Sequence, residues 1–108
     1  MATFSCPEPN ILALEGEIDL HDAPALKEQF ARMQEGKPER LFIDLSSVRY
    51  IDSSGLAVFI GVMQSVAAYG GKLGLYGIQE NVQTVFRISR LDQVFRIFAT
   101  RAEAEAGL

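Results

Sequence analysis

The residues with the clearest potential for chemistry are two serines between an aspartate and a glycine, in the run Asp52-Ser53-Ser54-Gly55. The side chains of Asp52, Ser53 and Ser54 can all accept hydrogen bonds from the amides that begin a helix. A helix N-terminus also presents unpaired amide hydrogens and positive dipole character, which favour an anion such as a phosphate. A phosphoserine there would add almost two negative charges without unravelling the helix. The run is therefore either a capped helix start alone or a capped helix start that is also a phosphorylation site.

The helix expected to follow, over residues 54–69, carries no charged residue. We place Leu56, Phe59 and Val66 among its sheet-facing residues, which leaves Val58 and Val62 on other faces. The outer apolar surface then needs a cover, either a neighbouring helix or a partner protein. A phosphate beside an apolar docking face would act as a switch, because the dianion would have to lose water on contact.

The remaining pattern alternates strands and helices. Apolar or alternating runs predict the strands, helical spacing predicts the helices, and a loop is expected at 46–51. Asp22 before Pro24 predicts a helix start at which the carboxylate accepts the first amides. The expected strands are 3–6, 11–18, 41–45, 72–76 and 95–98, and the expected helices are 22–36, 54–69, 80–88 and a fraying one at 101–108. This order predicts an α/β fold with a small, mixed, mostly parallel sheet of about four or five strands and about four helices.

Composition restricts the class of protein. The chain has 108 residues, of which 48% are hydrophobic, so residues 1–108 are expected to form one domain with one core. The net charge of −4 disfavours direct contact with nucleic acid. No Cys/His spacing in the sequence predicts a metal site. The single cysteine, Cys6, cannot form an internal disulfide, and no secretory signal is recognisable, so we expect a cytoplasmic location. The uncharged stretch 53–71 has an unbroken apolar run only at 56–63, which predicts a buried helix without membrane insertion.

With Gly16-Glu17-Ile18-Asp19 and Ile43-Asp44-Leu45 upstream of it, the serine-containing run resembles the STAS domain of bacterial anti-sigma-factor antagonists. The similarity in motifs and in element order extends from Thr3 to Thr100. This chain has Ile18 where the family motif has leucine, a small departure that leaves Asp19 able to lie near the serine loop.

The resemblance implies that Ser53 is the phosphoacceptor, with Asp19, Asp52, Ser54 and Gly55 around it. It implies a regulatory protein rather than an enzyme: the unphosphorylated form binds an anti-sigma factor that is also a serine kinase and thereby releases a sigma factor. Phosphorylation inactivates the antagonist, and a serine phosphatase reverses it. ATP and metal belong to those partners, so no cofactor is expected here. From the apolar pattern of the helix itself, we expect Val58 and Val62 to form part of the docking face. The alternative is an accessory or scaffold subunit of another signalling or lipid-transport complex, whose contacts would be indifferent to phosphate on Ser53.

Two other arrangements have weaker claims. His21 could be imagined in a triad with Ser53, but the Gly-x-Ser-x-Gly elbow of hydrolases is absent from the sequence, so we expect a solvent-facing loop histidine. Asp44 resembles a receiver-domain phosphoacceptor by its place after an apolar strand. Its more ordinary role is to order the turn at Ser46 and Ser47.

Overall fold

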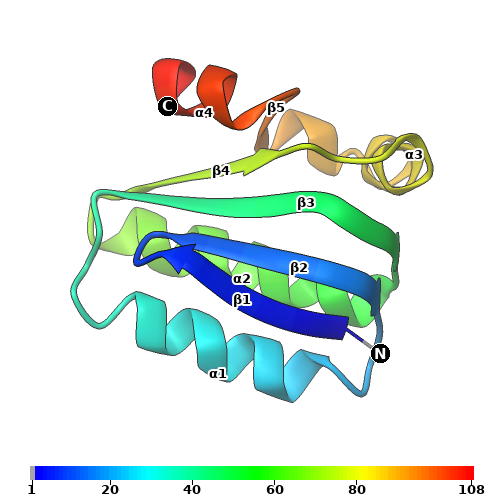
Figure 1. Ribbon diagram of the computed structural model, residues 1–108, viewed down its shortest axis with the longest axis horizontal. Coiled ribbons are helices and arrows are strands. Elements are labelled where there is room, and N and C mark those ends of the chain that lie inside the picture. The colour runs from blue at the N-terminus through cyan, green and yellow to red at the C-terminus, as the bar shows by residue number, and fades with distance from the viewer. Residues whose placement is uncertain (1) are drawn as a thin grey trace.

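The computed structural model describes residues 2–108, whose strands pair in the order β1-β2-β3-β4-β5. Its elements are β1 (Ala2–Glu8), β2 (Ile11–Ile18), α1 (Ala23–Met33), β3 (Arg40–Ile51), α2 (Ser53–Ala68), β4 (Lys72–Tyr76), α3 (Glu80–Ile88), a 3-10 helix (Leu91–Gln93), β5 (Arg96–Phe98) and α4 (Arg101–Gly107). Strand β1 is antiparallel to β2, and the other neighbours are parallel. The prediction of an α/β fold with a mixed, mostly parallel sheet is confirmed (Figure 1).

Strand β3 is much longer than the strand expected at 41–45. It pairs with β2 as far as Ile18 and Ile51, whereas β4 pairs only with residues 40–44. The expected loop at 46–51 is therefore wrong. Within residues 2–108, no strand pairs with the free edge of β3 beyond residue 44, and the side-chain amides of Gln79 and Asn81 donate there to the carbonyls of Ser46 and Arg49. The strand thus carries its chain directly to the serine-containing run.

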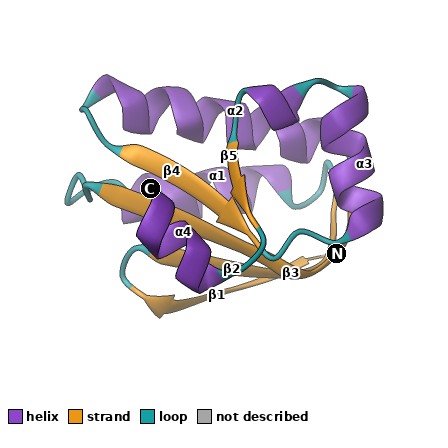
Figure 2. Ribbon diagram, turned by 90° about the horizontal axis from the view of Figure 1, so that it is seen from above, coloured by secondary structure: helices purple, strands orange, loops and turns teal. Residues whose placement is uncertain are grey.

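Helices α1 and α2 cover one face of the sheet, and α3 lies beside them (Figure 2). Three phenylalanines join these helices in the core. The ring centroids of Phe30 on α1 and Phe59 on α2 lie 6.1 Å apart, and that of Phe86 on α3 lies 6.5 Å from Phe59. Apolar residues of the interior strands pack against the same layer, so this face holds the main core. Within residues 2–108, no helix is both long and apolar enough to cross a bilayer.

Helix α4 covers the opposite face of the sheet. Its fully buried Ala104 packs with Ile11, Phe42 and Tyr76 from three neighbouring strands. Burial, together with the nearby carboxylates of Asp44 and Glu105, raises the pKa of Tyr76 to about 12. The guanidinium of Arg40 donates to the Glu105 carbonyl at 2.7 Å, which satisfies an acceptor that the helix end leaves open. The expected final helix is thus present and belongs to the packed structure.

Candidate functional site

The serine-containing run lies at the end of the sheet where β2 and β3 both finish. The backbone N–H of Asp52 donates to the Ile18 carbonyl at 3.0 Å, which fixes the start of α2 against the last residue of β2. The two upstream motifs therefore meet in space. Residues at the carboxyl ends of parallel strands commonly form the sites of α/β folds.

Asp52 is the N-cap of α2, one of the three residues that the sequence offers for this role. Its backbone is extended, and its carboxylate Oδ1 accepts from the amide of Ser54 at 2.9 Å and from that of Gly55 at 3.1 Å. The next amide, that of Leu56, donates to the Asp52 carbonyl at 3.1 Å. One residue thus accepts from three successive amides of the first turn and holds the helix start in one conformation.

The two serines differ in accessibility. Ser53 is the first residue of α2 and is exposed, whereas Ser54 is half-buried. A modifying enzyme must surround the hydroxyl that it phosphorylates, so exposure favours Ser53 over its neighbour. The expected solvent-facing position of His21 is confirmed, because its side chain is 93% exposed.

Gly55 occupies a point where α2 touches both strands. A Cβ atom there would lie 2.8 Å from Cγ1 of Ile51 and 2.9 Å from Cγ2 of Ile18. Because such distances are shorter than carbon atoms tolerate, the close approach of the helix to the strand ends requires glycine. Gly55 therefore acts on the site by setting the position of Ser53.

Asp19 lies on the loop that follows β2, next to Ile18 and hence beside the start of α2. Its carboxylate accepts from the backbone N–H of His21 at 2.9 Å. Its own backbone N–H donates to the carboxylate of Asp22 at 3.1 Å. The structure therefore brings Asp19, Asp52, Ser54 and Gly55 to the same end of the sheet as Ser53.

Asp22 has a different role from the one its sequence position predicts. It precedes α1, but its carboxylate makes no cap hydrogen bond to that helix. It accepts instead from the backbone N–H of Ala2 at 3.0 Å and from that of Asp19, which ties the start of β1 to the β2–α1 loop. Burial alone would raise the pKa of Asp22, but these hydrogen bonds outweigh it and hold the pKa below its ordinary value.

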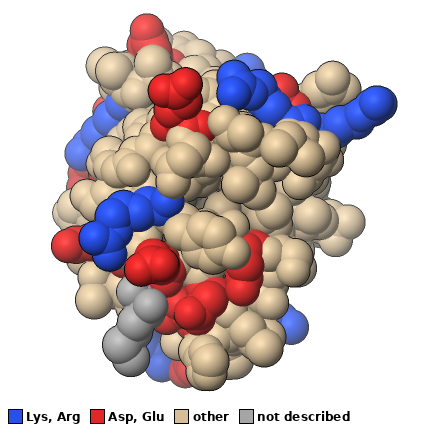
Figure 3. Space-filling view, turned by 90° about the vertical axis from the view of Figure 1, so that its right-hand side faces the viewer, with Lys and Arg blue, Asp and Glu red and all other residues tan. Residues whose placement is uncertain are grey.

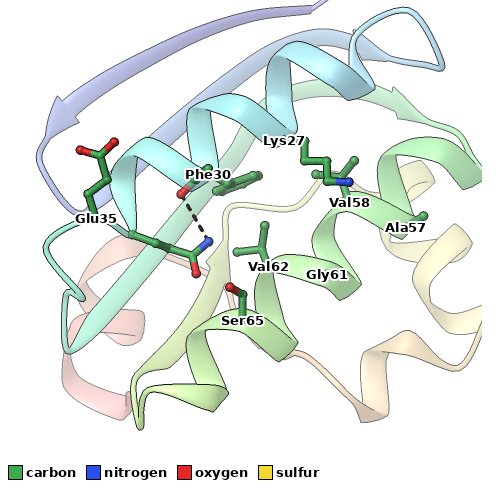
Figure 4. Close-up of a pocket in the computed structure, with 10 residues that line it drawn as sticks. Lys27, Phe30, Glu35, Ala57, Val58, Gly61, Val62 and Ser65 are labelled. Carbon is green, nitrogen blue, oxygen red and sulfur yellow. Dashed lines mark hydrogen bonds between the residues drawn. The ribbon is translucent and has the colours of Figure 1, made fainter.

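Of the two covers that the sequence leaves open for the outer face of α2, a neighbouring helix is the one found over Val62, so its expected place in the docking face is wrong. Its side chain is only 5% exposed, because α1 packs over that face of α2. Val58, one turn earlier, is half-buried. Both residues line a groove of about 520 Å³ between α1 and α2, shown in Figure 4 with Lys27 and Glu35 on its rim. Of the two valines, Val58 remains the more accessible to a partner.

The small residues of α2 lie open to solvent along this groove. Ala57 and Gly61 are exposed and follow Ser53 at intervals of four residues, so they lie on the same helix face. Nothing lies within 4 Å of the position that a Cβ on Gly61 would take. Sequence periodicity did not single out this face, because its residues are neither bulky nor charged.

Acidic side chains gather on one part of this end of the molecule. Figure 3 shows the side on which β2 and β3 end, and a group of acidic side chains gathers in its lower half. Glu17, Asp19 and Asp52 belong to the strand ends and loops there, and the guanidinium of Arg49 lies 3.8 Å from the Glu17 carboxylate. A phosphate on Ser53 would add negative charge to a surface that already carries it.

Comparison with known proteins identifies the family. The STAS domain matches residues 6–104. This chain belongs to the STAS domain family. It is 36% identical over 95 residues to the anti-sigma-B factor antagonist of Bacillus subtilis, covering 88% of this chain and 84% of the relative. It is also 37% identical over 82 residues to the anti-sigma-B factor antagonist of Listeria monocytogenes, covering 76% of this chain and 72% of that relative.

Solved structures of STAS proteins share the fold. An anti-sigma factor antagonist from Mycobacterium paratuberculosis superposes with a TM-score of 0.86 at 24% identity, over 98% of this chain and 92% of that chain. The antagonist SpoIIAA in its unphosphorylated form matches with a TM-score of 0.71 at 18% identity, covering 100% of both chains. Its phosphorylated form, from Bacillus, matches with a TM-score of 0.69 at 20% identity, over 98% of this chain and 97% of that chain. The family's fold is therefore the fold of this chain.

Proposed function

We propose that this STAS domain is a cytoplasmic anti-sigma-factor antagonist controlled by phosphorylation of Ser53. The observation that carries the proposal is the exposed Ser53 hydroxyl directly after the Asp52 N-cap, in a chain similar to anti-sigma-B factor antagonists over most of its length. The protein acts by binding rather than by catalysis. Its unphosphorylated form binds an anti-sigma factor and thereby releases the sigma factor.

The off state forms by phosphoryl transfer. The anti-sigma factor, acting as a serine kinase, moves the γ-phosphoryl group of ATP to Oγ of Ser53, ADP leaves, and the hydroxyl proton passes to the kinase. A serine phosphatase later hydrolyses the ester and returns the hydroxyl and inorganic phosphate. The phosphorylated surface binds poorly because a dianion must lose its water on contact, beside the carboxylates of Asp19 and Asp52.

The docking face is proposed to continue from Ser53 along α2. Ala57 and Gly61 offer a flat, uncharged surface, and Val58 adds apolar area at the edge of the groove. Val62 forms the floor beneath and is too buried for a large share of the contact. A partner that covers this face would come within reach of the Ser53 hydroxyl at its N-terminal end.

A phosphorylation and release assay tests this function. The protein would be incubated with ATP and the anti-sigma factor of its own organism, in complex with the sigma factor. We expect sigma factor to leave the complex at first, and phosphopeptide mapping to find the phosphate on Ser53. Ser54→Ala is the matched control and should be phosphorylated normally, whereas Ser53→Ala should release sigma factor without accepting phosphate. Phosphate confined to Ser54, or no release of sigma factor, would contradict the proposal.

A further inference from the structure

The first turn of α2 has little capacity left for an additional anion. The amides of Ser54 and Gly55 donate to the Asp52 carboxylate, and the amide of Leu56 donates to the Asp52 carbonyl. A helix start leaves four amides without a partner inside the helix, here those of residues 52–55. The amide of Asp52 donates to the Ile18 carbonyl and those of Ser54 and Gly55 donate to the Asp52 carboxylate, so within residues 2–108 only the amide of Ser53 has no acceptor. A group attached to Oγ of Ser53 therefore meets a helix end at which every donor except the amide of Ser53 itself is already engaged.

This arrangement departs from the usual behaviour of a phosphoserine at a helix start. A phosphate at that position normally folds back onto the unpaired amides and is stabilised by them and by the helix dipole. Here it would have to displace a carboxylate that already holds two amides at 2.9 and 3.1 Å. The carboxylate would also repel the dianion, because the two groups sit on adjacent residues.

We propose that Asp52 is a positioning residue that keeps a phosphate on Ser53 out of its own helix and directed into solvent. The inference rests on the proposed function only in taking Ser53 as the phosphoacceptor. An outward phosphate meets an approaching partner with its full charge, and it remains open to the phosphatase. A phosphate bonded to the helix amides would be partly neutralised and harder to hydrolyse. The N-cap thus determines how strongly the modification acts.

Other charged groups share this end of the molecule. The β2–α1 loop contributes Asp19 and His21, and the strand ends contribute Glu17 and Arg49, which pair with each other at 3.8 Å. Their effect on the phosphate remains in any variant of Asp52. A comparison among Asp52 variants therefore isolates the contribution of the N-cap itself.

The test is a ³¹P NMR titration of protein carrying phosphoserine at position 53, incorporated during translation so that neither kinase nor partner is needed. Three proteins are compared with one another and with the urea-unfolded chain: wild type, Asp52→Asn and Asp52→Ala. Asparagine keeps the cap acceptor without the charge, whereas alanine frees both amides. The second phosphate pKa, ordinarily about 6, should lie above the unfolded value in wild type. It should fall by roughly half a unit or more in Asp52→Asn and below the unfolded value in Asp52→Ala.

Thermal denaturation supplies a second measurement. Phosphorylation should leave the melting temperature of wild type unchanged or lower it. It should raise the melting temperature of Asp52→Ala, because only in that variant are the amides of Ser54 and Gly55 free to bind the phosphate. If Asp52→Ala does not fold, the difference in phosphate pKa between wild type and Asp52→Asn still tests the inference.

The inference is overturned if the phosphate pKa in wild type lies below the unfolded value, if Asp52→Asn leaves it unchanged, or if a folded Asp52→Ala is no lower than Asp52→Asn. None of these results depends on an anti-sigma factor. Failure here would leave the proposed partner switching intact, and failure of partner switching would leave this result standing.

Discussion

At the scale of single residues, Gly55 and Gly61 form a natural pair on one helix. A Cβ on Gly55 would lie within 2.9 Å of two isoleucine side chains, whereas a Cβ on Gly61 would meet nothing within 4 Å. Gly55→Ala should therefore lower the free energy of unfolding by about 1–3 kcal/mol through overpacking. Gly61→Ala should raise it by about 0.5–1 kcal/mol through helix propensity. Urea denaturation measures both, and equal effects would contradict the close approach at Gly55.

The buried carboxylate of Asp22 gives a prediction about acid stability. Its pKa is held below the ordinary 3.8, so its ionised form stabilises the fold above that value, and the contribution is lost as the pH falls through the lower, folded-state pKa. Asp22→Asn should lower the free energy of unfolding at pH 7 by about 1–3 kcal/mol, since a hydrogen bond from a backbone amide is lost. The difference between the two proteins should shrink below about pH 4. A difference that stays constant down to pH 2 would show that the charge of Asp22 contributes nothing.

Asp52 and Asp22 show which contacts of a side chain can be predicted from sequence. Asp52 accepts from amides two and three residues ahead, so a local rule includes it among the candidate caps Asp52, Ser53 and Ser54. Asp22 also has the residue type and position of an N-cap, but its carboxylate accepts from the amide of Ala2, twenty residues away. A local rule has no access to such a partner, because only the pairing of β1 with β2 brings it there.

At the scale of elements, the face of α2 that carries Val62 is covered by α1, whereas the face that carries Ala57 is open to solvent. Val62→Lys would replace a buried side chain under α1 with an ammonium that must lose its water or push α1 away, and should lower the free energy of unfolding by about 3 kcal/mol or more. The control, Ala57→Lys, lies on the exposed side of the same helix and should change stability by about 0.5 kcal/mol or less. It should nevertheless weaken binding to the anti-sigma factor roughly tenfold, a cost of about 1.4 kcal/mol. Thermal melting and calorimetry measure the two effects, and unchanged binding by Ala57→Lys would remove this face from the docking surface.

The sequence predicted the existence of α2 well and the burial of its faces poorly. In an amphipathic helix, the contrast between apolar and charged residues predicts which face is buried. Over residues 53–68 there is no charge to supply that contrast, so Val62 looked as free as Val58. The same difficulty affected β3, where exposed Ser46 and Ser47 hid a strand that continues to Ile51. In both cases the tertiary neighbour decides, α1 for the helix and β2 for the strand.

At the scale of the whole molecule, the sheet separates two layers with different roles. Helix α4 closes one face over Phe42 and Tyr76, and α1 and α2 close the other (Figure 2). Ser53 is the first residue of α2. The fold resembles SpoIIAA in both its unphosphorylated and its phosphorylated form.

The most direct test of this account is the affinity of the protein for the anti-sigma factor of its own organism, measured by calorimetry with and without phosphate on Ser53. The desolvated charge should weaken binding by about 2 kcal/mol or more, roughly thirtyfold. Ser53→Ala should bind like the unphosphorylated protein, because the hydroxyl itself is not required. Equal affinities for the phosphorylated and unphosphorylated forms would contradict the account and favour a constitutive scaffold.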